Sequence, residues 1–205
     1  MNILTFVAGA FILLMTVTLH ELCHGWVAYR LGDDTAKRAG RLTLNPLAHI
    51  DPFWTVILPG LLFITTGGRF VIGMAKPVPV DFTQLRRPKR DMIYVALAGP
   101  LANIWLAVLL NFFFKFSGNI LFLVAIYFNL GLAIFNLIPI PPLDGSRILA
   151  GLLPTRWAVR YLRLEPYGFG IVLLLYMSGL LFHLIVPGID FFCRSLGVPL
   201  AGGEF

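Results

Sequence analysis

The chain has 205 residues, of which 58% are hydrophobic and 13% are charged, and its formal net charge is +6. Soluble domains contain about 45–50% apolar and about 25% charged residues, so this composition excludes an ordinary soluble domain and indicates a polytopic membrane protein. The positive charge does not indicate a nucleic-acid-binding protein, because the lysines and arginines cluster in loops between apolar runs and form no basic stripe with interleaved aromatic residues.

Four apolar segments are long enough to cross a bilayer as helices, which takes about 20 residues. In chain order they run from about residue 3 to 29, from 92 to 114, from 120 to 140 and from 168 to 186. A fifth apolar run, residues 52 to 66, is shorter and contains Pro59 and Gly60. Runs of that length more often re-enter the membrane than span it, so we expect a re-entrant segment here.

Two further segments are predicted to lie at the inner membrane surface. Residues 67 to 81 are rich in glycine, proline and β-branched residues, which indicates extended chain or a small β-hairpin at the cytoplasmic face. Residues 155 to 164 place three arginines on one helical face and aromatic residues on another, which indicates a short amphipathic helix. The predicted fold class is therefore an all-α polytopic membrane protein with about four transmembrane helices, a re-entrant segment and a small β-hairpin.

These segments predict one membrane-embedded domain over residues 1–205. Its core covers about residues 1–150, followed by an interfacial helix within 151–167 and a last transmembrane helix at 168–187. The stretch from residue 30 to 90 holds ten lysines and arginines, the stretch from 145 to 168 holds four, and the other two are Lys115 and Arg194. Because positive loops remain in the cytoplasm, both ends of the chain are expected on the outer side.

Residues 20 to 24 read His-Glu-Leu-Cys-His and lie near the inner end of the first apolar segment. Histidines four residues apart project from one face of a helix and can share a metal ion, and the adjacent glutamate can act as a general base on a water molecule. Ionisable side chains are costly at bilayer depth. His20, Glu21 and His24 therefore indicate metal-assisted hydrolysis within or just beneath the membrane surface.

A third ligand is predicted where the third crossing ends. This crossing is interrupted by Pro139, Pro141 and Pro142, and Asp144 follows at the cytoplasmic boundary. His20 lies about 17 residues along its own helix, which is roughly 26 Å into a hydrocarbon core about 30 Å thick, so both positions have a similar depth. A catalytic zinc typically has three protein ligands and one open position. His20, His24 and Asp144 complete that set for one Zn²⁺ ion per chain.

Three motifs in this order resemble the site-2 protease family of intramembrane zinc metalloproteases. They are H-E-x-x-H in the first helix, A-G-P-L-A-N at 98 to 103, and N-x-x-P-x-x-x-x-D-G at 136 to 145. Residues 40 to 52 resemble the compact bacterial members, without a PDZ or CBS domain. The resemblance implies zinc held by His20, His24 and Asp144, with Glu21 as general base and Asn136 near the scissile peptide. It also implies a bacterial cytoplasmic membrane, with the active site near the cytoplasmic face.

Two asparagines are candidate substrate-binding residues. Asn136 is expected to donate a hydrogen bond to the scissile carbonyl oxygen or to hold the substrate backbone. An interhelical hydrogen bond without a chemical role is an equally open interpretation. Asn103 lies early in the second crossing and is a further candidate. His49 and His183 are interpreted as residues that fix a loop and pack between helices, respectively.

The expected function is hydrolysis of peptide bonds within or near transmembrane segments, with single-span membrane proteins as substrates and the lipid bilayer as surroundings.

The alternative is a divalent-metal transporter or channel, since intramembrane His, Glu and Asp also line ion paths. A transporter does not need Glu21 between the histidines, and the chain has no internal repeat. An inactive scaffold protein and a peptidase with a glutamate as third ligand are two further alternatives. Intact Glu21 argues against the first, and the position of Glu165 and Glu204 outside apolar helices argues against the second.

Overall fold

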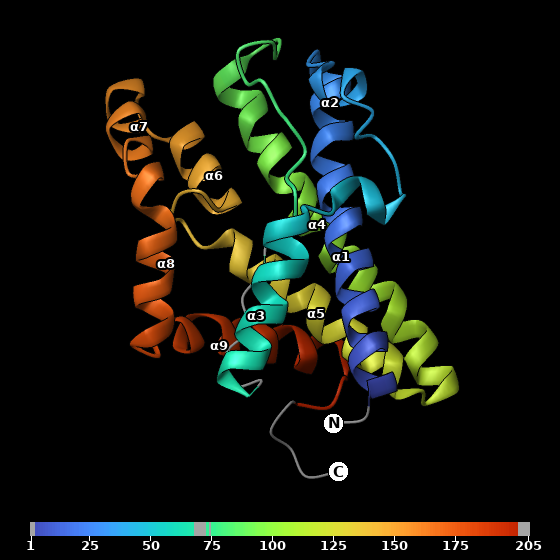
Figure 1. The fold of residues 1–205 in the computed structure, drawn as a ribbon. Coiled ribbons are helices and arrows are strands. Elements are labelled where there is room, and N and C mark those ends of the chain that lie inside the picture. Colours follow the sequence, from blue (N-terminus) through green and yellow to red (C-terminus); the bar gives the residue numbers. More distant parts are fainter. Residues whose placement is uncertain (1–2, 68–72, 74, 201–205) are drawn as a thin grey trace.

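Three long helices form the centre of the molecule (Figure 1). The computed structural model describes residues 3–67, 73 and 75–200. Helices α1 (Ile3–Leu31), α4 (Pro88–Ser117) and α5 (Ile120–Leu137) pack against one another. Residues 7–31 of α1, together with all of α4 and all of α5, are long and apolar enough to cross a membrane. Many large apolar side chains on these helices are exposed, as expected where a helix faces lipid.

The connections between these helices follow from local sequence. Gly118 adopts a φ of 63°, in the left-handed region that ends α4, and Asn119 then caps α5 by accepting a hydrogen bond from the Leu121 nitrogen at 2.9 Å. Helix α5 ends at Leu137, just before the proline-rich turn. A buried apolar cluster lies where α4 and α5 meet the last helix. Its members are Ala107, Leu123, Ile126, Leu130, Cys193 and Val198.

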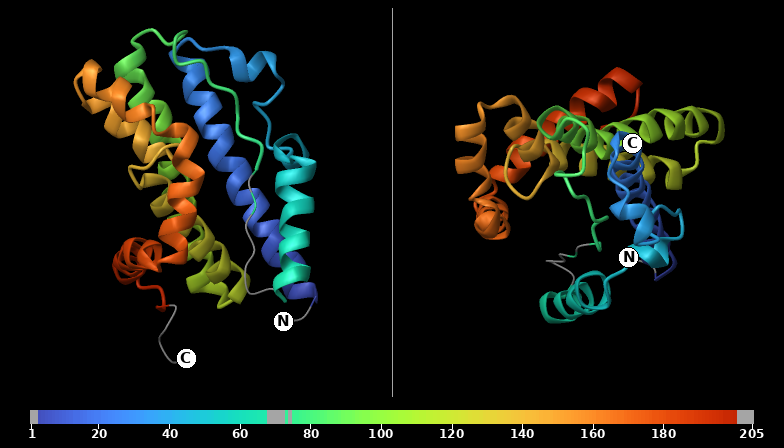
Figure 2. Two further views of the ribbon diagram at one scale, coloured as in Figure 1. Left: turned by 60° about the vertical axis from the view of Figure 1, so that its left-hand side comes forward. Right: turned by 90° about the horizontal axis from the view of Figure 1, so that it is seen from above.

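Short elements connect α1 to α4. They are α2 (Thr35–Arg38), the 3₁₀ turn η1 (Pro46–His49), the π-helical turn η2 (Pro52–Ile57) and α3 (Leu58–Thr66). Figure 2 shows that α3 stands outside the bundle of α1, α4 and α5. The Lys76 nitrogen donates to the His49 carbonyl oxygen at 2.9 Å. The segment that leads to α3 and the segment that follows it are therefore in contact at these two residues. That this excursion re-enters a membrane stays a prediction.

The predicted β-hairpin over residues 67 to 81 is wrong. The described residues contain no strand, and residues 75–80 run as extended chain without a partner strand, while residues 68–72 and 74 lie outside the described residues. The composition of this segment correctly indicates extended chain, but it does not indicate which groups its amides bond. Pro77 and Pro79 lack an N–H group, so this segment cannot supply the regular donors of a ladder. Its amides bond elsewhere: Lys76 to His49, Val78 to Glu21, and Asp81 to Asp33.

The last expected span is not one straight helix. After α6 (Asp144–Leu152), α7 (Thr155–Leu162) and the 3₁₀ turn η3 (Glu165–Tyr167), the chain forms α8 (Gly168–Met177) and α9 (Leu180–Leu196). The helical stretch ending with α8 meets α9 at 81°. Gly179, with a φ of 76°, occupies this bend. In Figure 1, α9 lies across the end of the molecule at which α1 begins. Among the described residues, three helices are long and apolar enough to cross a membrane, or four if the bent pair counts as one span.

Candidate metal centre

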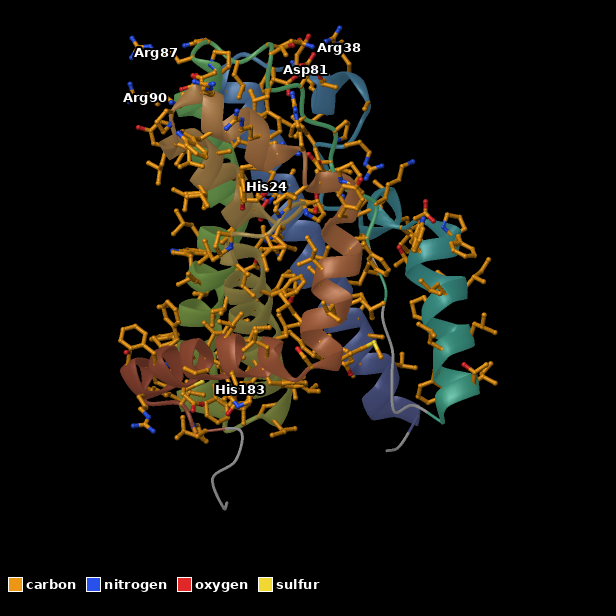
Figure 3. The ribbon with its side chains drawn as sticks, turned by 90° about the vertical axis from the view of Figure 1, so that its left-hand side faces the viewer. His24, Arg38, Asp81, Arg87, Arg90 and His183 are labelled. Atoms are coloured by element: carbon orange, nitrogen blue, oxygen red, sulfur yellow. The ribbon has the colours of Figure 1, made fainter. Side chains whose placement is uncertain are left out.

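Helix α1 buries both histidines of its motif on the face that packs against α4. His20 is 3% exposed and His24 is 8% exposed, and their Nε2 atoms are 3.0 Å apart. This closeness is the expected result of four-residue spacing on a helix. Figure 3 shows His24 between the end of the molecule that carries Arg38, Arg87 and Arg90 and the opposite end, where His183 lies.

Asp144, the first residue of α6, completes the cluster. Its Oδ2 atom lies 3.2 Å from Nε2 of His20 and 3.2 Å from Nε2 of His24. The candidate ligand atoms of the three residues all lie within 4.8 Å of one another. Burial raises the pKa of the Asp144 carboxyl, but the adjacent His20 and His24 outweigh burial and hold it at about 2. The carboxylate is therefore ionised at neutral pH.

Each histidine makes a hydrogen bond through Nδ1, on the side of the ring away from Asp144. These bonds determine which ring nitrogen carries the proton and which directs a lone pair toward the cluster. Nδ1 of His24 lies 2.7 Å from the Val95 carbonyl oxygen, which can only accept, so Nδ1 carries the proton. Nδ1 of His20 lies 2.6 Å from Oδ1 of Asn103 and is protonated for the same reason. In the neutral rings both Nε2 atoms then direct lone pairs toward Asp144, whose buried Oδ2 has no hydrogen-bond partner among the described residues.

Three acceptor atoms that converge in a buried site are suited to hold a cation among them. Two imidazole nitrogens and one carboxylate oxygen form a ligand set that zinc uses in catalytic sites, with room for a further ligand. The residues present therefore fit a zinc ion. The predicted meeting of Asp144 with the histidine pair is seen in the structure.

Gly99 on α4 lets this cluster form. A Cβ atom there would lie 2.7 Å from Nε2 of His20 and still closer to Nε2 of His24. Real Cβ atoms essentially never come this close to another atom, so a larger residue at position 99 would have to displace the two rings. Nothing in the local sequence reveals that Gly99 packs against the metal-facing nitrogens of His20 and His24.

Glu21 is half-buried and contacts the extended segment, residues 75–81. Its Oε2 atom accepts a hydrogen bond from the Val78 nitrogen at 2.7 Å. The segment is also held by Arg41, whose Nη2 atom donates to the Lys76 carbonyl oxygen at 2.7 Å. The Val78 side chain is buried against α1 at Gly25, where an added Cβ would lie 2.8 Å from Cγ1 of Val78. Sequence reasoning missed these contacts, because nothing local connects residue 21 to residue 78.

The two candidate asparagines have different surroundings. Asn103 is completely buried and its amide contacts His20. Asn136 is half-buried near the end of α5, and its Nδ2 atom donates to the Leu132 carbonyl oxygen of the same helix at 3.0 Å. The described hydrogen bonds and ion pairs do not connect Asn136 to the metal cluster.

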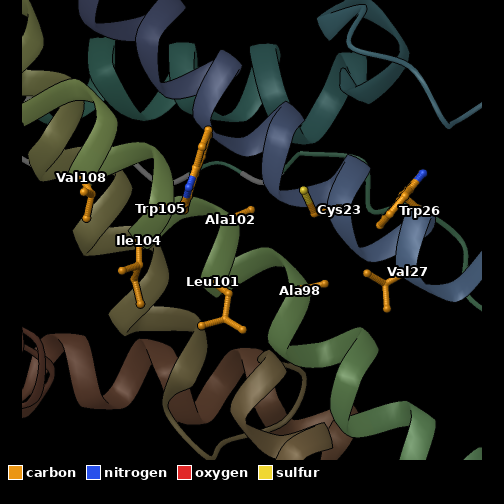
Figure 4. Close-up of a pocket in the computed structure, with 9 residues that line it drawn as sticks. All are labelled: Cys23, Trp26, Val27, Ala98, Leu101, Ala102, Ile104, Trp105 and Val108. Atoms are coloured by element: carbon orange, nitrogen blue, oxygen red, sulfur yellow. The ribbon is translucent and has the colours of Figure 1, made fainter. Parts of the chain in front are cut away.

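An apolar groove of about 590 Å³ lies between α1 and α4 (Figure 4). Its lining includes Cys23, Trp26, Ala98 and Trp105. Cys23, although it lies within the histidine motif, therefore lines this groove. The groove presents few polar atoms, and none of the three clustered residues lines it.

Comparison with known proteins agrees with this site. Residues 8–120 and 117–179 match the family model described as Peptidase family M50. YwhC of Bacillus subtilis is 37% identical over 190 residues, which cover 85% of this chain and 82% of YwhC. Rip2 of Mycolicibacterium smegmatis is 33% identical over 214 residues, which cover 96% of this chain and 80% of Rip2. MJ0611 of Methanocaldococcus jannaschii is 31% identical over 172 residues, which cover 81% of each chain.

All three of these names contain the words zinc metalloprotease. No solved structure matches the chain. The family model covers most of the chain, including the histidine motif, the Gly99 helix and Asp144. The chain therefore belongs to peptidase family M50, the site-2 protease family, and is an integral membrane protein and a zinc metalloprotease.

Proposed function

We propose that this protein is an intramembrane endopeptidase that hydrolyses peptide bonds within or near the transmembrane segments of other membrane proteins. The observation that carries this proposal is the position of the metal cluster. Nε2 of His20, Nε2 of His24 and Oδ2 of Asp144 converge, and both histidines, like the adjacent Glu21, belong to a helix of membrane-spanning length. A peptidase site built there is suited to substrates that are themselves embedded in the bilayer.

In this proposal His20, His24 and Asp144 hold the zinc ion. When bound, zinc lowers the pKa of water and polarises the carbonyl of the scissile peptide. The protein keeps the two imidazoles in the required tautomer through Val95 and Asn103. Asp144 supplies the negative charge that partly balances the cation.

Glu21 serves as the general base and then as the general acid. It follows His20 directly in α1 and is not one of the three clustered residues. The Val78 amide holds Oε2, and the described residues give Oε1 no hydrogen bond. Oε1 is then able to accept a proton from the attacking water and deliver it to the amine that leaves.

Asn136 is proposed to contact the substrate near the scissile bond. Its Nδ2 atom donates to Leu132 within α5, which orients the amide and leaves Oδ1 and the second N–H for another partner. The charged end of the molecule shown in Figure 3, with Arg38, Arg87 and Arg90, is proposed to face the cytoplasm. This orientation in a bacterial cytoplasmic membrane would place the active site nearer to the cytoplasmic side.

The test compares purified full-length wild type with Glu21→Gln and His20→Ala in detergent. Bound zinc is measured together with cleavage of a panel of single-span test substrates. Glu21→Gln should keep about one zinc per chain and lose cleavage, because the base is not a ligand. His20→Ala should lose both. Cleavage by Glu21→Gln at the wild-type rate, or full zinc retention by His20→Ala, would contradict the assignment of roles.

A further inference from the structure

We propose that a buried chain of three polar side chains, Thr16, Asn103 and Asn129, positions His20 and fixes its tautomer for metal binding. The inference rests on the proposed role of His20 as a zinc ligand. It assigns a positioning role to Thr16 and Asn129, which lie outside the sequence motifs, and it gives Asn103 a role other than contact with substrate.

The three side chains come from the three central helices. Thr16 lies on α1 one turn before His20, Asn103 lies on α4 and Asn129 lies on α5. Thr16 is 2% exposed, and both asparagines are 0% exposed. Uncharged polar groups at such depth are costly unless they are hydrogen-bonded, so a connected set of them in an apolar helix bundle requires an explanation.

The hydrogen bonds have one consistent direction. Asn129 Nδ2 lies 2.8 Å from the Ala125 carbonyl oxygen, and because a carbonyl can only accept, the amide nitrogen must be on that side. Oδ1 of Asn129 therefore accepts from Nδ2 of Asn103, at 2.8 Å. Oδ1 of Asn103 is then left to face Nδ1 of His20 at 2.6 Å.

This direction determines the protonation of the histidine. An acceptor at Nδ1 requires the His20 proton to be there, and the lone pair is then on Nε2, the nitrogen that faces Asp144 and His24. If the Asn103 amide turned over, it would present an N–H group to Nδ1 and favour the wrong tautomer. The chain from Ala125 through both asparagines prevents that turn.

Thr16 completes the network from the turn of α1 that precedes His20. Its Oγ1 atom lies 3.1 Å from Nδ2 of Asn129, and its carbonyl oxygen lies 3.4 Å from Nδ2 of Asn103. Both asparagines thus contact the turn of α1 that precedes His20. The network connects the three helices at the depth of the ligand cluster and restricts the rotation of the His20 ring.

Loss of groups that orient a metal-binding histidine commonly weakens metal affinity by about 10-fold to 100-fold. We therefore expect Asn129→Leu to weaken zinc affinity by about that factor, since Asn103 loses the partner that fixes its orientation. Thr16→Val keeps the shape but removes the hydroxyl, so it should weaken affinity by a smaller factor. Thr16→Ser retains the hydroxyl and should restore affinity close to the wild-type value.

The matched control is Asn111→Leu. Asn111 is also a buried asparagine on α4, but its Nδ2 atom donates to the Leu196 carbonyl oxygen at 2.9 Å, away from His20. This variant should lower stability without changing zinc affinity. The zinc Kd is measured on full-length protein in detergent by competition with a chelator, and the melting temperature of the metal-free protein reports folding.

Weaker zinc binding in Asn129→Leu and Thr16→Val, with affinity retained in Thr16→Ser and Asn111→Leu, supports the proposal. Wild-type zinc affinity in Asn129→Leu overturns it, as does a loss in Asn111→Leu equal to that in Asn129→Leu. His20→Ala distinguishes a failure of the proposed ligand set from a failure of the positioning role alone. If His20→Ala retains zinc, the proposed ligand set has failed. If it loses zinc while Asn129→Leu does not, only the positioning role has failed.

Discussion

Oε2 of Glu21 and the backbone nitrogen of Val78 are 2.7 Å apart, although 56 residues separate them in the chain. This hydrogen bond joins the proposed general base to the extended segment that follows α3. The same segment is held by Arg41 and by His49. The orientation of the base therefore depends on a part of the chain that contributes no metal ligand.

Val78→Pro removes that N–H donor. We expect cleavage to slow by about 10-fold or more, because a hydrogen bond to a charged group contributes about 1.5–3 kcal/mol. Zinc content should be unchanged, because Val78 does not contact the ligand cluster. Initial rates on a single-span substrate, with zinc measured in the same samples, check this.

Val80→Pro is the matched control for that experiment. Val80 lies in the same extended segment and packs against the cluster of Ala28, Leu85 and Val95. The Val80→Pro variant should retain more activity than Val78→Pro, since the Val80 amide does not bond Glu21 in the described structure. Equal losses in the two variants would show that the segment matters in some way other than through Glu21.

Gly99→Ala should disrupt the metal centre directly. The new methyl group would overlap Nε2 of His20 and His24, and relief of such overpacking typically costs about 1–3 kcal/mol. We expect zinc affinity to fall by about 10-fold or more. Gly170→Ala on α8, where a Cβ meets no atom within 4 Å, should bind zinc normally. Equal zinc affinity in the two variants would contradict the close packing of α4 on the histidines.

Asp144→Asn should abolish the stabilisation that zinc provides. A ligand that binds only the folded state stabilises it by about 2.7 kcal/mol at 100 times its Kd, so adding zinc should raise the melting temperature of wild type. Asparagine keeps the size of the side chain but removes the anionic ligand. Thermal unfolding with and without a chelator measures the shift. Asp190→Asn on α9 should keep the wild-type shift, and a normal shift in Asp144→Asn would exclude Asp144 as a ligand.

Asn136→Ala tests the proposed contact with substrate. Removing a hydrogen-bond donor to the reacting carbonyl typically lowers kcat by about 100-fold, whereas zinc content should remain at the wild-type level. The control is Asn119→Ala, which truncates the cap at the other end of α5 and should affect stability alone. Near-normal turnover by Asn136→Ala would leave that side chain with a packing role.

The sequence alone determined the features that depend on neighbouring residues. Apolar length predicted the three long helices, and four-residue spacing predicted that His20 and His24 share one face. Pro139 predicted the end of α5, and the length of each helix predicted that Asp144 meets the histidines at a similar depth. These predictions succeed because helix rise, helix periodicity and the geometry of proline are set locally.

Only the tertiary structure decided which distant groups meet. The amides of residues 75–81 find partners on α1 and in the loops, so the expected β-hairpin does not form in the described chain. The bend at Gly179, the approach of Gly99 to the ligand nitrogens and the chain from Thr16 through Asn129 to His20 likewise join distant positions. The physical reason is that a buried polar group must find a partner, and the three-dimensional fold determines which partner is within reach.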